Sequence, residues 1–288
     1  MNRISKISQH VIATRNVSSK PQDDRLVVTI IGGGNSGHVT CALLKENLKG
    51  KVVVQLLTSV PETFSDKKIV CEFPNGTEQV GEIDVVSSDP EALIPQSDVV
   101  LWTGPVNRTK AVFERLNGLF DVRKTAVGTI FAQGLSHLVA YRVFGPKVRF
   151  FALRNIPWLC RTITKGKRCA IVGPKTSIEA NVVNLDETFL KDVIEPMFVT
   201  QHVGVWEPVI EQMPDFCPIV FNPANQIIHP ARYYGMFRNY SGTPLKGDEA
   251  PPEFLYRGMD ELSGNVLQAL DDELQAIKNA YFKVGEKI

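Results

Sequence analysis

The sequence has no apolar run near the roughly 20 residues that a membrane-spanning helix needs, and it has almost no net charge. Its 32 lysines and arginines are balanced by 31 aspartates and glutamates, so the formal net charge is +1. This balance argues against a nucleic-acid binder that works by bulk electrostatic attraction. We therefore expect neither a membrane nor a nucleic acid as a partner. The length of 288 residues and the 43% of hydrophobic residues fit a globular protein of about two domains.

Paired cysteines are also missing. The five cysteines are odd in number and no two are spaced two residues apart: Cys41, Cys71, Cys160, Cys169 and Cys217. This pattern argues against a disulfide framework and a zinc knuckle, so no metal site is predicted. We expect these cysteines to be small core residues of a protein in a reducing compartment, the cytoplasm.

The first 25 residues contain no acid before Asp23, but they carry Arg3, Lys6, Arg15 and Lys20. Two interpretations stay open for this segment. It is a loose leader ahead of the first strand, or it is a basic, acid-poor mitochondrial presequence.

The most informative stretch present is a strand, a glycine turn and a helix. The apolar run Val27–Ile31 stops at Gly32, Gly33 and Gly34, and an amphipathic helical pattern follows Asn35, Ser36, Gly37 and His38. In this context the pattern Gly-x-Gly-x-x-Gly binds a dinucleotide. Gly32 permits the tight turn, Gly34 lets the backbone approach a pyrophosphate, and Gly37 lets the helix lie close to the strand. The helix N-terminus then offers N–H groups to the phosphates.

The cofactor prediction depends on the end of the second strand, Val52–Leu57. An acid near this point commonly holds the ribose 2′-hydroxyl of NAD, but here the strand ends in Thr58-Ser59 and the nearest acid is Glu62. No arginine stands beside them to hold a 2′-phosphate. The prediction is therefore NAD, with NADP less favoured. Thr58 either binds the ribose or simply ends the strand.

Further along the chain, strands and helices alternate. Strands are expected at 98–103, 125–131 and 148–153, helices at 109–119 and around His137, and hairpins within 68–86 and 161–172. In the first hairpin, strands at 69–71 and 82–86 flank a turn at 74–76. This alternation predicts an α/β protein with a Rossmann-type, doubly wound, mostly parallel sheet.

The amino-acid composition changes near residues 208–218, which include three prolines, and this change marks the predicted domain boundary. We predict a leader at 1–25, a dinucleotide-binding domain at 26–213 and the start of a helical substrate domain at 214–288. A proline- and glycine-rich loop is expected at about 241–252. An apolar stripe at helical spacing, from Met259 to Tyr281, predicts a core face with little to pack against. Left uncovered, such a stripe would favour association of chains into a homo-oligomer.

Four of the five histidines are expected to be non-catalytic. His10 lies in the leader, and His38 packs or caps at the glycine turn. His137 and His202 have no neighbours in sequence that suggest a proton relay. His229 differs, because it lies near Asn222 and Arg232 just after the boundary. Pro230 follows it and disfavours a continuing helix through the histidine. Histidine can supply the proton that hydride reduction of a C=O or C=N bond requires, but spacing alone leaves a catalytic and a structural role open.

Several segments together resemble the octopine/opine dehydrogenase family. They are the glycine motif with Asn35 and His38, the segment 156–161 (IPWLCR), the segment from Asn222 to Pro230, and the segment 254–260 (FLYRGMD). The matches run in family order from about residue 26 to the end.

The resemblance implies an NADH-dependent reductive condensation of a 2-oxo acid, usually pyruvate, with an amino acid. His229 occupies the position of the family's catalytic histidine, which exchanges the proton while the nicotinamide supplies hydride. Gln133 matches a position that lines the family's cleft, and it is alternatively a turn residue.

The family pairs this histidine with an aspartate and holds the substrate carboxylate with an arginine, both in a later part of the second domain that the sequence does not include. We therefore expect a fragment or a shortened form with impaired chemistry. Arg232 and Arg238 are the basic residues near enough in sequence to replace that arginine.

Two other functions stay open. One is an NAD-dependent dehydrogenase of a hydroxy acid or sugar phosphate, and the other is an inactive NAD-binding remnant that acts as a partner protein.

Overall fold

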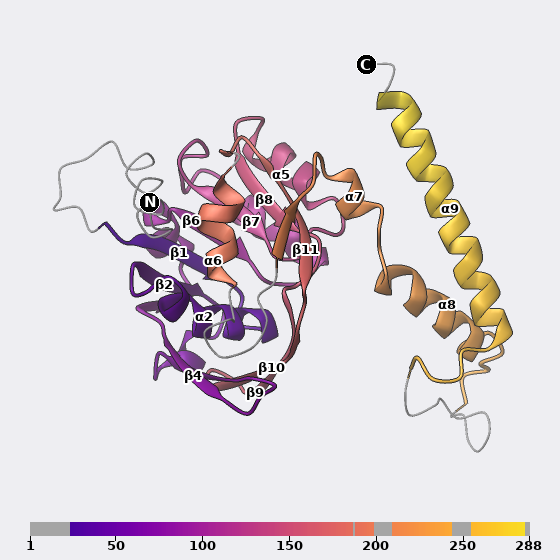
Figure 1. The fold of residues 1–288 in the computed structure, drawn as a ribbon, viewed down its shortest axis with the longest axis horizontal. Helices are drawn as coiled ribbons and strands as arrows, with labels where there is room; N and C mark the ends of the chain where they lie inside the picture. The colour runs from indigo at the N-terminus through magenta and orange to yellow at the C-terminus, as the bar shows by residue number, and fades with distance from the viewer. Residues whose placement is uncertain (1–23, 187, 199–208, 244–254, 286–288) are drawn as a thin grey trace. The chain divides into compact units, whose positions relative to one another are not determined.

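The apolar run that precedes the glycines forms β1 (Leu26–Ile31), which lies buried as an inner strand of an eight-stranded sheet (Figure 1). The strand order is β12-β11-β8-β7-β6-β1-β2-β5, and all neighbours pair in parallel except β8 and β11. From β5 to β8 this is the 3-2-1-4-5-6 order of a doubly wound Rossmann sheet. The predicted α/β fold is confirmed.

The computed structural model describes residues 24–186, 188–198, 209–243 and 255–285. Most of the predicted leader, His10, His202 and most of the proline- and glycine-rich loop lie outside these residues. Besides β1, the large sheet contains β2 (Val52–Leu57), β5 (Val85–Ser87), β6 (Val99–Trp102), β7 (Ala126–Thr129), β8 (Arg149–Leu153), β11 (Ser177–Val183) and β12 (Val209–Gln212). The helices are α2 (Asn35–Asn47), α3 (Pro90–Leu93), α4 (Thr109–Leu116), α5 (Ser136–Phe144), α6 (Glu195–Met197), α7 (Cys217–Val220), α8 (Asn225–Phe237) and α9 (Glu261–Gly285). No helix in the described ranges is both long and apolar enough to cross a membrane.

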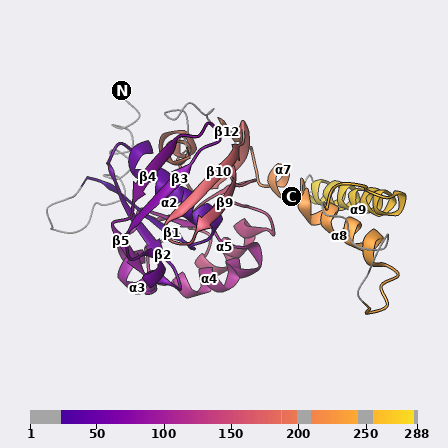
Figure 2. The ribbon, with the colours of Figure 1, turned by 90° about the horizontal axis from the view of Figure 1, so that it is seen from below.

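Both faces of the large sheet are covered, which explains why its central strands read as continuous apolar runs. Along β1, Val28 and Ile30 pack in the core beneath α2 and α6, whereas Ile31 packs in the core beneath α3, α4 and α5. Figure 2 shows α3, α4 and α5 together on one side of the sheet, and α2 on the other. The alternation fixes the face of the sheet on which each side chain packs, and the carboxyl end of β1 brings Gly32 to the edge where ligands bind in such sheets.

A second sheet packs on the outer side of α2. Its order is β4-β3-β10-β9, built from β3 (Lys68–Glu72), β4 (Glu78–Glu82), β9 (Trp158–Thr164) and β10 (Arg168–Pro174). The hairpin expected within 161–172 is confirmed, because β9 and β10 pair antiparallel. The other predicted hairpin is wrong in its second strand. Residues 78–82 pair with β3, while 85–87 leave the hairpin and extend the large sheet as β5.

Four cysteines meet between α2 and the second sheet. Cys71 and Cys169 are opposite each other on β3 and β10, and the thiols of Cys41 and Cys160 lie near them. All are buried and unpaired by disulfides, as is Cys217, so the prediction of core cysteines is confirmed. Burial raises the pKa of the Cys41 thiol, and contact with Cys71 raises that of Cys169.

The chain divides into two compact units, residues 1–219 and 220–288. The second unit is built from α8 and α9, which contact each other. Helix α8 includes both His229 and Pro230, so the expectation that Pro230 disfavours a helix continuing through the histidine is wrong. Proline removes one N–H and crowds the carbonyl four residues earlier, but neighbouring turns and packing against α9 keep the helix intact.

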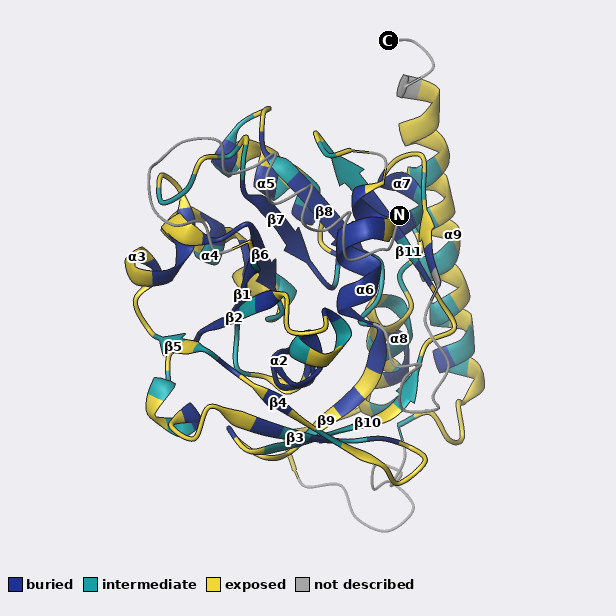
Figure 3. Cartoon of the chain, turned by 60° about the vertical axis from the view of Figure 1, so that its left-hand side comes forward, coloured by how far each residue is buried: buried dark blue, intermediate teal, exposed yellow. Residues whose placement is uncertain are grey.

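The apolar stripe of α9 is a core face only in part. Its first half is partly buried, whereas Ile277 and Tyr281 are 58% and 55% exposed (Figure 3). The reason is length, because α8 has 13 residues and α9 has 25. At about 1.5 Å per residue, α8 can cover only about half of α9. Met259 precedes the first residue of the helix.

Candidate functional site

The turn after β1 is held in shape by its glycines and by one threonine. Gly32 has φ of +110°, a conformation that side chains rarely adopt. The hydroxyl of Thr103, at the end of β6, donates to the carbonyl oxygens of Ile31 and Gly32 at 2.9 and 3.2 Å. This bond ties the turn to the neighbouring strand and orients the peptide units that follow.

The other glycines of the motif differ in the space around them. A Cβ on Gly37 would lie 1.9 Å from the Gly32 carbonyl oxygen, and one on Gly33 would lie 2.8 Å from the Phe64 ring. A Cβ on Gly34 would meet nothing within 4 Å. Gly37 is therefore required for close packing of the helix on the turn. Gly34 instead presents bare, exposed backbone, which is the surface a pyrophosphate approaches.

Helix α2 begins at Asn35 directly after this turn, and its first N–H groups have no partner within the helix. Together with the helix dipole they suit an anion. The Asn35 side chain turns to the second sheet, where its Oδ1 accepts from the Thr162 N–H at 2.8 Å. The Ser36 side chain is buried and contacts Cys160. Any contact of Ser36 with a phosphate would therefore use its backbone.

His38 is fully buried one turn into α2 and is neutral in a single tautomer. Its Nδ1 lies 2.8 Å from the Gly34 carbonyl oxygen, and its Nε2 accepts from the Gly166 N–H at 2.7 Å. A carbonyl only accepts and an N–H only donates, so these partners place the proton on Nδ1. Burial lowers the pKa of His38. The expectation that His38 packs at the turn is confirmed, and it also joins the turn to the β9–β10 hairpin.

Thr58 lies at the carboxyl end of β2, beside the glycine turn. It is 7% exposed, and its Oγ1 would be 3.1 Å from a Cβ on Gly33. Its N–H donates to the Ser87 carbonyl oxygen, which joins it to β5. The residue thus has a structural position at the place where a ribose would lie in a Rossmann fold.

Gln133 follows β7 at the same edge of the sheet. It is 5% exposed, and its Nε2 donates to the Ile219 carbonyl oxygen at 3.0 Å. Four residues later, the His137 ring stacks on Phe216 with centroids 4.4 Å apart, and burial lowers the pKa of His137. Both side chains hold the end of the first unit in place.

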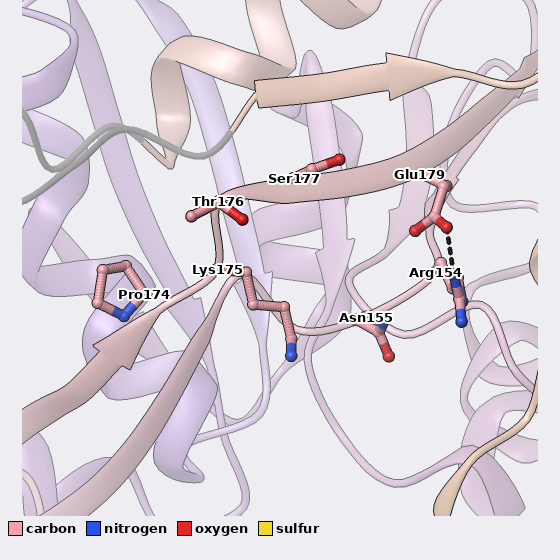
Figure 4. A pocket seen from close by; sticks show the side chains of 7 residues that line it. All are labelled: Arg154, Asn155, Pro174, Lys175, Thr176, Ser177 and Glu179. Carbon is pink, nitrogen blue, oxygen red and sulfur yellow. Dashed lines mark hydrogen bonds and ion pairs between the residues drawn. The ribbon is translucent and has the colours of Figure 1, made fainter.

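A shallow hollow of about 440 Å³ lies where β8 ends and β11 begins (Figure 4). Arg154 and Glu179 form an ion pair in its wall, and Lys175 extends beside Asn155. Pro174, Thr176 and Ser177 complete the lining. Because β8 is parallel to β1, this hollow opens at the same edge of the sheet as the glycine turn. Its ammonium, hydroxyl and amide groups can accept a small polar anion.

In the second unit, His229 lies in the middle of α8. Its Nε2 is 2.6 Å from the Tyr256 hydroxyl, and its ring lies 6.3 Å from that of Tyr233. Asn222 is exposed in the segment before α8.

Arg232 is 4% exposed and is used inside the second unit. It donates to the carbonyl oxygens of Leu255 and Arg257 and pairs with Asp260 at 2.8 Å. These contacts give Arg232 a structural role. The contact of Arg232 with substrate stays a prediction, because its guanidinium already binds these three groups.

Two residues that contact the predicted site residues, Thr103 and Tyr256, were not predicted from the sequence. The only signal for Thr103 is its position at the carboxyl end of a strand that lies next to β1. That position becomes apparent only when the order of strands in the sheet is known. Tyr256 lies in a segment that carried the family resemblance, but 27 positions separate it from His229. No local pattern predicts that pair. Within the described ranges no group of three or more His, Cys, Asp or Glu side chains could hold a metal.

Known proteins resemble this chain in sequence and in fold. Residues 212–287 match the family described as NAD/NADP octopine/nopaline dehydrogenase, alpha-helical domain. An opine dehydrogenase from Haliotis discus hannai is 24% identical over 271 residues, which cover 89% of this chain and 65% of the relative. An octopine dehydrogenase from Mizuhopecten yessoensis is 24% identical over 267 residues, covering 88% and 64%. The chain thus spans less than two thirds of these relatives.

A solved structure of octopine dehydrogenase with NADH and L-arginine has a similar fold. Its TM-score is 0.75 at 20% identity, and the match covers 90% of this chain and 65% of that one.

Proposed function

We propose that the chain is a member of the octopine/opine dehydrogenase family and takes part in the NADH-dependent reductive condensation of a 2-oxo acid with an amino acid. The observation that carries the proposal is the glycine turn, where open space at Gly34 adjoins the start of α2. The description of the matching family, which names NAD/NADP, and the complex of octopine dehydrogenase with NADH support the same cofactor.

Gly32, Gly33 and Gly34, with the first N–H groups of α2 at Asn35, Ser36 and Gly37, would hold the pyrophosphate. Thr58 would face the adenine-side ribose. A 2′-phosphate there would meet Glu62 and no arginine within residues 58–62, which favours NADH over NADPH. When bound, the cofactor supplies the hydride.

His229 would exchange the proton of the condensation. The amino nitrogen attacks the carbonyl carbon of the 2-oxo acid, water leaves, and the resulting C=N bond is reduced to a secondary amine. The overall change consumes one NADH and one proton and releases one water. A histidine suits this work, because it gains and loses a proton near neutral pH.

Gln133, in the first unit, and Asn222, in the second, are the further residues that we propose to bind substrate. Gln133 lies at the cofactor edge of the sheet, and its fixed position gives the carboxamide oxygen a defined direction. The 2-oxo acid is proposed as pyruvate, in keeping with a solved octopine dehydrogenase structure that contains NADH and pyruvate.

The test is NADH oxidation with pyruvate alone, with an amino acid alone, and with both, using arginine, alanine, glycine and taurine in turn. Oxidation that needs both substrates supports the proposal. Oxidation with a single hydroxy-acid or sugar-phosphate partner indicates another class of dehydrogenase. Binding of NADH without turnover indicates an inactive remnant.

A residue test uses His229→Gln. We expect turnover to fall by about 100-fold or more and the Kd for NADH to change little, because the glycine turn belongs to the other unit. Tyr234→Phe is a matched control, since Tyr234 is an exposed residue on the same helix. Full activity of His229→Gln would contradict the assignment.

A further inference from the structure

Asn35, the first residue of α2, is bonded to a strand of the second sheet. That strand is β9, which ends the strand order β4-β3-β10-β9 and is therefore an edge strand. The N–H of Thr162 on β9 donates to the Oδ1 of Asn35 at 2.8 Å, although 127 positions separate the two residues. The start of α2, directly after the glycine turn, is thus tied to a strand edge from a distant part of the chain.

The chemistry of this bond fixes the direction in which the carboxamide of Asn35 faces. A carboxamide accepts through its oxygen and donates through its nitrogen, whereas a backbone N–H only donates. The atom that faces Thr162 must therefore be the oxygen. A rotation of the carboxamide by half a turn would place Nδ2 against the Thr162 N–H, donor against donor. The Nδ2 group, with its two N–H donors, is consequently held on the side away from Thr162.

The Nδ2 group belongs to an exposed residue beside the open part of the glycine turn. Asn35 and Gly34 are both exposed, and a Cβ on Gly34 would meet nothing within 4 Å. The other polar side chains in the first turn of α2 are buried: Ser36 lies against Cys160, and His38 is bonded to the Gly34 carbonyl oxygen. Within this turn, Asn35 therefore has the side chain that can donate to a ligand.

The first turn of α2 contains no acidic residue. A carboxylate at the position of Asn35 would also accept from the Thr162 N–H, and it would stabilise the positive end of the helix. Such a carboxylate would have no donor for a ligand, and its charge would repel a phosphate. A carboxamide instead keeps the bond to β9 and leaves the helix N-terminus to an outside anion. The residue type at this position therefore suits an anion site better than it suits the stability of the helix.

We infer that the Asn35 side chain binds the cofactor: its Nδ2 donates to the pyrophosphate of the dinucleotide, and the Thr162 N–H is the group that orients it. This inference rests on the proposed function. It deepens that function by making β9 of the second sheet a positioning element of the cofactor site. The glycine turn and the first N–H groups of α2 supply backbone donors, and Asn35 adds a side-chain donor whose direction is set by the fold.

The first test measures Kd by calorimetric titration of the full chain with NADH and with ADP-ribose, which contains the pyrophosphate but no nicotinamide. Asn35→Asp keeps an acceptor for Thr162 and loses both donors, so its Kd for each ligand should rise about tenfold or more. Its Tm without ligand should be equal or higher, because a negative charge suits the helix N-terminus. Asn117→Asp is the matched control. Asn117 is exposed and follows α4, so the same change of charge there should leave both Kd values unchanged.

The second test removes the orienting group. Thr162→Pro deletes the N–H at a position on an edge strand, where proline is tolerated, and Thr162→Ala keeps the N–H. We expect the Kd for NADH to rise about two- to fivefold in Thr162→Pro, because the carboxamide of Asn35 then spends less time in the binding orientation. Thr162→Ala should bind NADH as the wild type does. Far-UV circular dichroism checks that both variants are folded.

Nuclear magnetic resonance decides the same two points without Thr162→Pro. The full chain is labelled with 15N-asparagine and 15N-threonine. The side-chain N–H signals of Asn35, assigned by their loss in Asn35→Asp, should shift when ADP-ribose is added. The backbone amide of Thr162 should exchange with solvent more slowly in the wild type than in Asn35→Ala, which lacks the acceptor.

Equal Kd values for NADH in Asn35→Asp and the wild type, or Asn35 signals that do not move with ADP-ribose, overturn the role of the side chain. Equal exchange of the Thr162 amide in the wild type and Asn35→Ala, or equal Kd values in the two folded Thr162 variants, overturns the role of β9. A wild-type chain that binds neither NADH nor ADP-ribose contradicts the proposed cofactor site, and this inference fails with it. Binding by the wild type together with unchanged variants overturns this inference alone.

Discussion

Gly34 and Gly37 are three positions apart, yet different constraints act on them. The backbone at Gly37 lies against the Gly32 carbonyl oxygen, so a methyl group there would collide with backbone. The backbone at Gly34 faces open space and has no such neighbour in the protein. The requirement at Gly37 is therefore one of folding, whereas for Gly34 we propose a requirement for ligand approach.

The first prediction separates these two requirements. Gly34→Ala should weaken NADH binding about tenfold, or about 1.4 kcal/mol, with an unchanged Tm, because its methyl group occupies the space of the pyrophosphate. Gly37→Ala should lower stability by about 3 kcal/mol, as overpacking does. Calorimetric titration with NADH and thermal unfolding of both variants check this. A lower Tm for Gly34→Ala together with unchanged affinity would contradict the assignment.

The tight turn at Gly32 and the close packing at Gly37 could be predicted from the sequence, because a strand, a turn and a helix are local patterns. The partners that hold the turn could not. Thr103 directly follows β6, and Gly166 lies in a hairpin turn 128 positions after His38. Such contacts depend on sheet order and on a second sheet that no local pattern reveals.

Between elements, His38 joins α2 to the β9–β10 hairpin. It does so only while neutral, because a proton on Nε2 would face the Gly166 N–H. Burial lowers the pKa of His38 below its ordinary value of 6.5, so the unfolded chain binds the proton more readily than the folded one. Its contribution to stability is therefore complete above about pH 6.5 and is lost as the pH falls through that value toward the lower folded pKa.

The second prediction follows from the direction of the pKa shift of His38. His38→Gln, whose carboxamide oxygen can still accept from Gly166, should show a smaller loss of Tm than wild type between about pH 8 and about pH 5. Part of the slope will remain, since burial lowers the pKa of His137 as well. Scanning calorimetry over this range decides the matter. Parallel slopes in the two proteins would rule out His38 as a source.

Helix α8 shows where a local rule loses to packing. Proline disfavours a helix interior by about 3 kcal/mol, and this cost is the reason that the sequence predicted a break at Pro230. The helix nevertheless runs from Asn225 to Phe237, supported by α9 and by the buried guanidinium of Arg232. The apolar stripe on α9 could be predicted from the sequence, but the fact that α8 is too short to cover it could not.

For the whole molecule, the division into residues 1–219 and 220–288 separates the proposed cofactor site from the proposed proton-exchanging histidine. All three tryptophans, Trp102, Trp158 and Trp206, belong to the first range. Tryptophan fluorescence therefore reports on that unit alone, while circular dichroism reports on both.

The third prediction uses this asymmetry. NAD+ at about 100 times its Kd should stabilise the first unit by about 2.7 kcal/mol and raise the midpoint seen by fluorescence. The signal from α8 and α9 should melt at an unchanged temperature, because the second unit has no part of the glycine turn. NAD+ is preferred to NADH here because it does not absorb tryptophan emission. Equal shifts in both signals would show that the units unfold as one.

The four thiols beneath α2 allow the opening of the interface between α2 and the second sheet to be measured over time. A buried thiol whose pKa is raised cannot react with an alkylating reagent until the surrounding structure opens. Each opening of α2 from the second sheet would expose Cys41, Cys71, Cys160 and Cys169 together. The rate at which a folded sample acquires alkyl groups, counted by mass spectrometry, therefore measures the rate at which α2, which follows the glycine turn, opens from the second sheet.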